Sequence, residues 1–145
     1  GARVALMRFG VVLGKGGGAM ATMELPFKLG LGGPIGSGKQ WFPWIHLDDL
    51  VNALVFLLSA EECRGAFNFS APQPVRQKDF ARQLGAAYHR PALLPVPALV
   101  MKLVAGEFGR SLLQGQKVMP QALTESGYLF TYPDLSAALR EIVGG

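Results

Sequence analysis

Residues 33–50 constrain the fold more than any other part of the chain. Residues 33–39 fit the G-x-x-x-x-G-K spacing of a phosphate-binding loop. Residues 40–50 instead read as a strand that runs through aromatic side chains into a helix with acidic residues in its first turn. The two halves predict different kinds of protein, so choosing between them bears on both fold and function.

The phosphate-loop interpretation fails on its neighbours. A working loop needs a strand before it, a helix directly after it, and Ser or Thr beside the lysine to hold magnesium. Gln40 stands where the hydroxyl is needed, and Pro43 prevents a helix from following at once. We therefore interpret residues 33–39 as a glycine-rich turn, and a phosphate-loop nucleotide-binding protein is the least favoured alternative.

The second half of the segment predicts a helix over residues 47–58. Apolar residues recur at helical spacing, and they are Leu47, Leu50, Val51, Leu54 and Leu58. Asp48 or Asp49 is expected to cap the helix start. His46 beside them could belong to a metal site or an acid–base pair, but the chain has only 2 histidines. We expect a structural histidine, hydrogen-bonded at the helix start, and no metal site.

The rest of the chain alternates strand and helix before turning helical. Expected strands cover residues 4–13, 39–45 and 67–70; expected helices cover residues 20–29, interrupted by Pro26, and a segment around Phe80 and Leu84 that stops by Pro91. Gly65 is expected to end the helix predicted over residues 47–58. Beyond residue 91 we expect helices at 97–105, 107–114, 120–126 and 135–142, with a short strand at 128–132. This order predicts an α/β fold, with a helical part after residue 90.

Composition excludes several classes of protein. The chain has 145 residues, half of them apolar, which suits one globular unit. Its net charge of +4 is spread out, so no nucleic-acid partner is expected. No apolar run approaches the about 18 residues of a membrane helix, so no membrane partner is expected. Cys63 is the only cysteine, which favours a reducing compartment, and we expect a cytoplasmic protein.

Local catalytic motifs are weak or missing. Residues 14–19 fit G-x-G-x-x-A after a strand, but a dinucleotide site needs an acidic residue about 20 residues later, and residues 28–33 contain none. A loop near a ligand is the favoured interpretation. Neither Tyr-x-x-x-Lys nor G-x-S-x-G occurs. We therefore assign no catalytic residue.

Three ordered motifs together carry a family resemblance. They are RFGVVLG at residues 8–14, GGPIGSGKQW at 32–41 and WIHLDDL at 44–50. The chain resembles the second half of the atypical, epimerase-like short-chain dehydrogenase/reductases. GQKV at residues 115–118 and YPDL at 132–135 are similar to the C-terminal domain of that subfamily. The resemblance covers essentially the whole chain.

The resemblance implies a particular division of the fold. Members of the family bind NAD(P) through an N-terminal glycine motif on a Rossmann sheet, and a tyrosine–lysine pair moves the proton. Both features would precede Gly1. The resemblance then makes residues 1–90 the later part of a Rossmann-like parallel sheet, and residues 91–145 a mostly helical C-terminal substrate-side lobe.

The family also suggests site residues. By this resemblance Arg8, Gly10 and Gly14 lie beside the cofactor, and Gln40 and Trp41 beside a small-molecule substrate. Related enzymes often carry an arginine near the position of Gln40 that grips a diphosphate. Its absence here argues against a nucleotide-sugar substrate.

The expected function is the C-terminal portion of an NAD(P)-dependent oxidoreductase or epimerase-like protein of unknown substrate. The chain alone is expected to be inactive and to bind no cofactor tightly, because the glycine motif and the Tyr-x-x-x-Lys pair are absent. The alternative is a non-enzymatic module that self-associates as a homodimer through an open sheet edge on the strand at residues 4–13.

Overall fold

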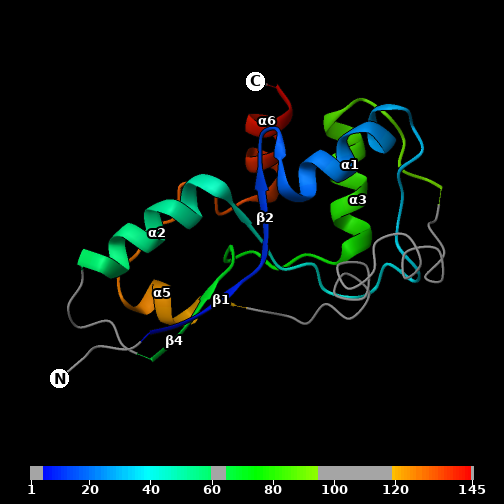
Figure 1. Cartoon of the computed structure of the whole chain (residues 1–145). Coiled ribbons are helices and arrows are strands. Elements are labelled where there is room, and N and C mark those ends of the chain that lie inside the picture. The colour runs from blue at the N-terminus through cyan, green and yellow to red at the C-terminus, as the bar shows by residue number, and fades with distance from the viewer. Residues whose placement is uncertain (1–4, 60–64, 95–118, 145) are drawn as a thin grey trace.

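The computed structural model describes residues 5–59, 65–94 and 119–144 (Figure 1). The elements are β1 (Ala5–Phe9), β2 (Val11–Gly14), α1 (Gly18–Lys28), β3 (Trp44–His46), α2 (Leu47–Ser59), β4 (Gly65–Phe69), α3 (Gln77–Ala87), α5 (Gln121–Glu125) and α6 (Leu135–Gly144). The helices expected at 97–105 and 107–114 lie outside the described residues. α1 continues through Pro26 to Lys28, and Gly65, at φ 97°, opens β4 where we expected it to end α2.

The strand expected at residues 4–13 is divided at Gly10. β1 pairs in parallel with β4, and β2 pairs in parallel with β3. Gly10 N donates to Phe69 O at 2.9 Å, and the next amide, Val11 N, donates to Pro43 O at 2.8 Å. The chain therefore changes partner strand here. A Cβ on Gly10 would lie 3.0 Å from the Pro43 backbone, so the close approach favours glycine.

The β2–β3 pair separates two hydrophobic cores. Val11, Leu13 and Trp44 face a first core, which α1, α3 and α6 complete. Val12 and Ile45 face a second core built with α2, β4 and α5. Both faces of this pair are therefore covered, as parallel strands require. The predicted α/β fold with parallel strands is confirmed.

The helices pack around these strands in a consistent way. α1 packs on β2, α2 contacts β2 and β3, α5 packs on β4, and α3 packs against α6. α6 forms at the helix expected over residues 135–142, and it buries four residues at helical spacing, Leu135, Ala138, Leu139 and Ile142. α6 joins the first core and α5 the second. A boundary at residue 90 stays a prediction.

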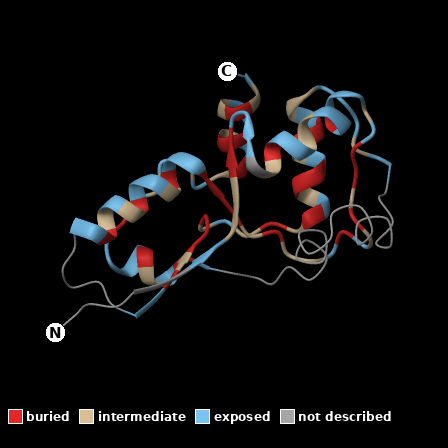
Figure 2. Ribbon diagram, in the orientation of Figure 1, coloured by how far each residue is buried: buried red, intermediate tan, exposed pale blue. Residues whose placement is uncertain are grey.

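The strand expected at residues 128–132 is absent, and α2 buries a different face from the apolar stripe that predicted the helix. Residues 128–132 form no strand and run as an irregular segment. α2 forms where expected, but its buried residues are Asp49, Ala53 and Leu57. Leu47, Val51 and Leu58 of this apolar stripe are exposed, and Figure 2 shows pale blue, exposed residues along α2.

Candidate functional site

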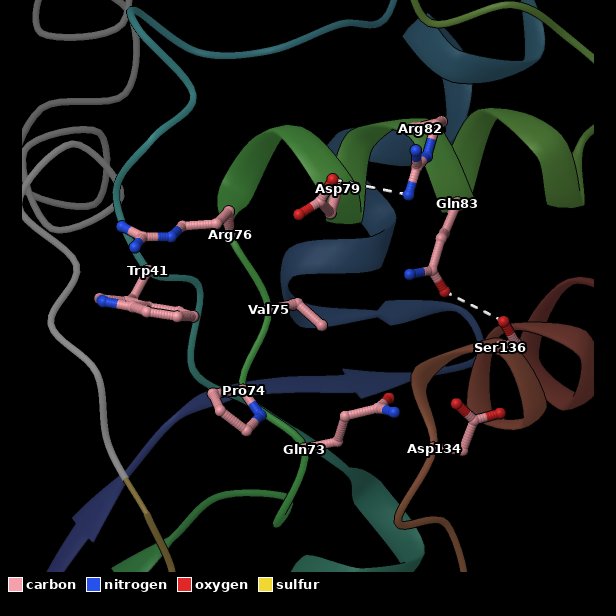
Figure 3. A pocket seen from close by; sticks show the side chains of 10 residues that line it. All are labelled: Trp41, Gln73, Pro74, Val75, Arg76, Asp79, Arg82, Gln83, Asp134 and Ser136. Atoms are coloured by element: carbon pink, nitrogen blue, oxygen red, sulfur yellow. Dashed lines mark hydrogen bonds and ion pairs between the residues drawn. The ribbon is translucent and has the colours of Figure 1, made fainter.

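An open pocket of about 440 Å³ lies between the starts of α3 and α6. Figure 3 shows Trp41 and Arg76 at one end and Asp134 and Ser136 at the other. The polar residues that line the space between them are Gln73, Asp79, Arg82 and Gln83. The pocket therefore joins elements that are far apart in the sequence.

Two side-chain contacts hold Arg76 at one end of this pocket. Its guanidinium carbon lies 3.8 Å from the centre of the Trp41 ring, and its Nη1 donates to Lys39 O at 2.6 Å. The backbones of Trp41 and Arg76 also form an antiparallel bridge. An arginine stacked on an indole keeps its remaining N–H groups available in a fixed geometry.

Arg76 is the functional candidate that the sequence analysis missed. We looked for an arginine close to Gln40 in the sequence, whereas the fold brings one from the start of α3 to the neighbouring Trp41. No local pattern marks this pairing, because it depends on how α3 packs. The argument against a nucleotide-sugar substrate therefore loses its main support.

The rest of the pocket wall balances its charges. Arg82 lies 3.5 Å from Asp79, and the Ser136 hydroxyl donates to Gln83 Oε1 at 3.0 Å. Asp134 Oδ2 accepts from the backbone N–H of residue 137 at 3.2 Å, which caps α6. Arginine and carboxylate side chains thus alternate around the pocket, an arrangement that suits a polar, hydrogen-bonding ligand.

The two predicted substrate residues have different surroundings. Trp41 lines the pocket. Gln40 does not line it. The Gln40 side-chain Nε2 donates to Ile35 O at 3.1 Å, and the Gln40 backbone carbonyl accepts from Gln77 N at 2.8 Å. Gln77 Oε1 in turn accepts from Ile35 N at 2.8 Å. These bonds fix the turn at residues 33–39 against α3, and no helix follows Lys39.

The three predicted cofactor residues lie along the β1–β2 line. Arg8 is exposed near the carboxyl end of β1, Gly10 is the crossing point, and Gly14 ends β2. A Cβ on Gly14 would lie 3.0 Å from the Leu47 side chain. None of the three lines the pocket beside Trp41. Their role beside a cofactor stays a prediction.

His46 caps α2 and links it to the C-terminal helix. Its Nδ1 accepts from Asp48 N at 3.0 Å, and its Nε2 lies 2.7 Å from Glu141 Oε2. The tautomer that satisfies both contacts carries its proton on Nε2. The ring also stacks on Tyr132 at 4.1 Å. The expected structural histidine is confirmed, and the cap is His46 instead of an aspartate.

Glu141 is the acidic partner in this cluster. The hydrogen bond from His46 lowers the pKa of the Glu141 carboxyl below its ordinary value of 4.5, and the positive charge of Lys15, 3.5 Å away, acts in the same direction. Lys15 belongs to the glycine loop at residues 14–19. The cluster therefore ties that loop to α6.

Asp49 is a buried carboxylate that links α2 to the irregular segment. Its Oδ1 accepts from the Tyr128 hydroxyl at 2.7 Å and from Thr131 N at 2.8 Å, and its Oδ2 accepts from Tyr132 N at 2.8 Å. Burial raises the pKa of the Tyr128 phenol above its ordinary value of 10.0, and the hydrogen bond to Asp49 raises it further. These bonds replace the strand pairing expected for residues 128–132.

The glycine loop has the context of a dinucleotide loop but lacks its acidic residue. β2, α1 and β3 form a parallel β–α–β unit around it. The second strand ends in His46, where a dinucleotide site has an acidic residue. Over residues 5–59, 65–94 and 119–144, no three His, Cys, Asp or Glu side chains gather closely enough to bind a metal ion. In the same residues, no helix is both long enough and apolar enough to span a membrane.

Parallel strands joined through helices define an α/β protein of the Rossmann-like type. Residues 96–142 match the family described as Domain of unknown function (DUF1731). The human epimerase family protein SDR39U1 is 51% identical over 145 residues, which is 97% of this chain and 48% of that protein. The chloroplastic homologue from Arabidopsis thaliana is 48% identical, over 97% of this chain and 41% of its own length.

Solved structures agree with this assignment. Human SDR39U1 (isoform 2), crystallised with NADPH, superimposes with a TM-score of 0.94 and 47% identity, over 99% of this chain and 49% of that one. A nucleoside-diphosphate sugar epimerase from Corynebacterium glutamicum gives 0.75 and 29%, over 98% of this chain and 26% of that one. The chain belongs to the epimerase family of short-chain dehydrogenase/reductases and corresponds to the C-terminal half of SDR39U1-like proteins.

The chain spans about half the length of the curated relatives it matches. The relative from Arabidopsis thaliana is chloroplastic, so a cytoplasmic location for this chain stays a prediction. Self-association finds no support among these relatives.

Proposed function

We propose that this chain is the substrate-side half of an NADP(H)-dependent oxidoreductase or epimerase-like enzyme. The observation that carries the proposal is its superposition, at a TM-score of 0.94, on half of a human relative that was crystallised with NADPH. The domain division at residue 90 belongs to the same proposal. Residues 1–90 complete the nucleotide-binding sheet, and residues 91–145 cover the substrate.

The predicted cofactor residues are compatible with a cofactor at the carboxyl end of β1. Arg8 is exposed there, whereas Gly10 and Gly14 can offer only backbone groups, because a Cβ on either would meet Pro43 or Leu47. A Cβ on Gly16 or Gly17 would meet nothing within 4 Å, so the backbone of the glycine loop is open to a ligand. When bound, NADP(H) supplies the hydride chemistry. Arg8 and the loop would hold one end of it, whereas the dinucleotide motif and the proton-transferring tyrosine come from the preceding half.

The pocket beside Trp41 is the proposed substrate-side site. The indole offers a flat apolar surface for a sugar or base ring, and Arg76 offers fixed N–H donors for an anionic or hydroxyl group. Gln40 supports Trp41 from the turn behind it. A small polar molecule with a ring and an anionic group, the class to which nucleotide sugars belong, fits these donors.

The test compares the complete protein with this chain. The complete protein should quench NADPH fluorescence on titration and bind UDP-glucose, the first probe for the substrate class, whereas this chain should bind NADPH weakly and turn over nothing. Arg76→Ala should weaken UDP-glucose binding about 10-fold while NADPH affinity stays the same, since one charge-assisted hydrogen-bonding group is lost. The exposed Lys78, which does not line the pocket, gives the control Lys78→Ala. NADPH-dependent turnover by this chain alone would contradict the division of roles.

A further inference from the structure

α2 carries a second apolar surface, which lies beside the polar edge of the helix. Leu47, Val51, Val55 and Leu58 are exposed by 42%, 50%, 56% and 77%. At 100° per residue these positions fall within about 80° of the helix circumference, so they form one continuous stripe. We call these four residues the α2 stripe. Figure 2 shows exposed surface along the outer side of α2.

The stripe is separate from the surface that α2 already buries. Ala53 and Leu57 face the second core, whereas Asp48 and Asn52 occupy the narrow polar edge. A helix that is apolar on most of its circumference is a buried helix. An exposed apolar stripe of this length marks a contact surface.

We propose that the α2 stripe is the docking surface for the upstream half of the complete protein. The inference rests on the proposed function, which makes this chain the C-terminal half of a protein about twice as long. It adds to that proposal by naming the helix face against which the upstream half packs.

The start of β1 lies on the same side of the molecule as the end of α2, which places the upstream half near α2. Ala5, the first described residue, pairs in register with Gly65, which lies six residues after the end of α2 at Ser59. Figure 1 shows β1 starting on the side of the molecule where α2 ends. In the described part of the chain β1 pairs only with β4, so its other edge also faces outward for a partner strand. A preceding segment therefore meets both an open strand edge and an apolar helix face.

The size of the stripe favours a tethered partner over a second copy. Four side chains are far fewer than the about 20–30 residues per side that stable interfaces between separate molecules use. A segment joined covalently to β1 is held at an effective concentration in the millimolar range, so it needs a much smaller contact. The upstream half meets this condition, and a second copy of this chain does not.

Cysteine labelling tests the proposal directly. In a Cys63→Ser background, Val55→Cys places a thiol on the stripe, and Asn52→Cys places one on the polar edge of the same helix. Both variants are made in this chain and in the complete protein, treated with a maleimide, and read at the labelled peptide by mass spectrometry. NADPH titration of each complete protein reports separately on the proposed function.

The expected result is a difference that appears only in the complete protein. Val55→Cys should react as fast as Asn52→Cys in this chain, and at least about 10-fold more slowly in the complete protein, because a covered thiol reacts only when the contact opens. Equal rates in the complete protein overturn the proposal. Slow labelling of Val55→Cys in this chain, together with a dimer mass by light scattering, assigns the stripe to a second copy and also overturns it. Protection without NADPH binding keeps the interface and rejects the proposed function.

Discussion

At the residue scale, the two aspartates that follow His46 have unequal roles. Asp49 is buried and accepts three hydrogen bonds, from the Tyr128 hydroxyl and two backbone amides. Asp48 is exposed in the first turn of α2. Among the residues that the structure describes, Asp49 has no cationic partner, so this buried carboxylate depends on its hydrogen-bond donors. The pair therefore provides a matched comparison.

Asp49→Asn should destabilise the chain by about 2–3 kcal/mol, because its amide group would face the Tyr132 N–H as a second donor. Asp48→Asn should cost less than about 1 kcal/mol, since only an exposed charge near a helix start is lost. Urea unfolding followed by circular dichroism measures both. Equal losses for the two variants would contradict the role assigned to Asp49.

Glu141 makes stability depend on pH in the acid range. Its folded-state pKa lies below the ordinary value of 4.5, chiefly because His46 donates to it. The interaction therefore contributes fully above pH 4.5 and is lost as the pH falls through the lowered pKa. In Glu141→Gln, the free energy of unfolding should decrease less steeply as the pH drops below 4.5. The exposed Glu125 provides the control Glu125→Gln, which should leave that fall unchanged.

At the scale of elements, the sequence predicted those features that depend only on the local spacing of apolar residues. α6 has one apolar face, and its four core residues were identified from spacing alone. α2 has apolar residues on two faces, so spacing could not tell which face this chain buries. The segment at 128–132 reads as a strand, but its backbone amides bond to Asp49 across the fold. Such a partner is invisible to local pattern.

The candidate site shows the same limit. Trp41 was found from the family motif, and Arg76 was missed because its contact with Trp41 spans two elements. Gln40 was assigned with Trp41 by the same resemblance, but successive residues of an extended segment point to opposite sides, and Gln40 bonds to the turn instead. Sequence therefore identified the region of the pocket but not its charged group.

The change of partner strand at Gly10 gives a prediction about stability. Gly10→Ala would place a Cβ 3.0 Å from the backbones of Pro43 and Trp44, so β2 and β3 must separate slightly. Overpacking of this kind costs about 1–3 kcal/mol. Gly144→Ala, where a Cβ would meet nothing within 4 Å, is the control and should be neutral. Thermal unfolding of both variants measures the difference, and an unchanged midpoint for Gly10→Ala would show that the strands yield without strain.

At the scale of the whole molecule, the β2–β3 pair couples two cores that would otherwise be separate. Leu84 is fully buried in the first core and Leu123 in the second. Because Trp44 and Ile45 are neighbours on β3 that face opposite cores, loss of either core removes one face of the same strand pair. We therefore expect one cooperative transition.

Leu84→Ala and Leu123→Ala should each cost about 2–5 kcal/mol, with tryptophan fluorescence and circular dichroism reporting the same midpoint in each variant. Two midpoints in Leu123→Ala, with tryptophan fluorescence unchanged, would mean that the residues beyond 90 unfold as a separate domain.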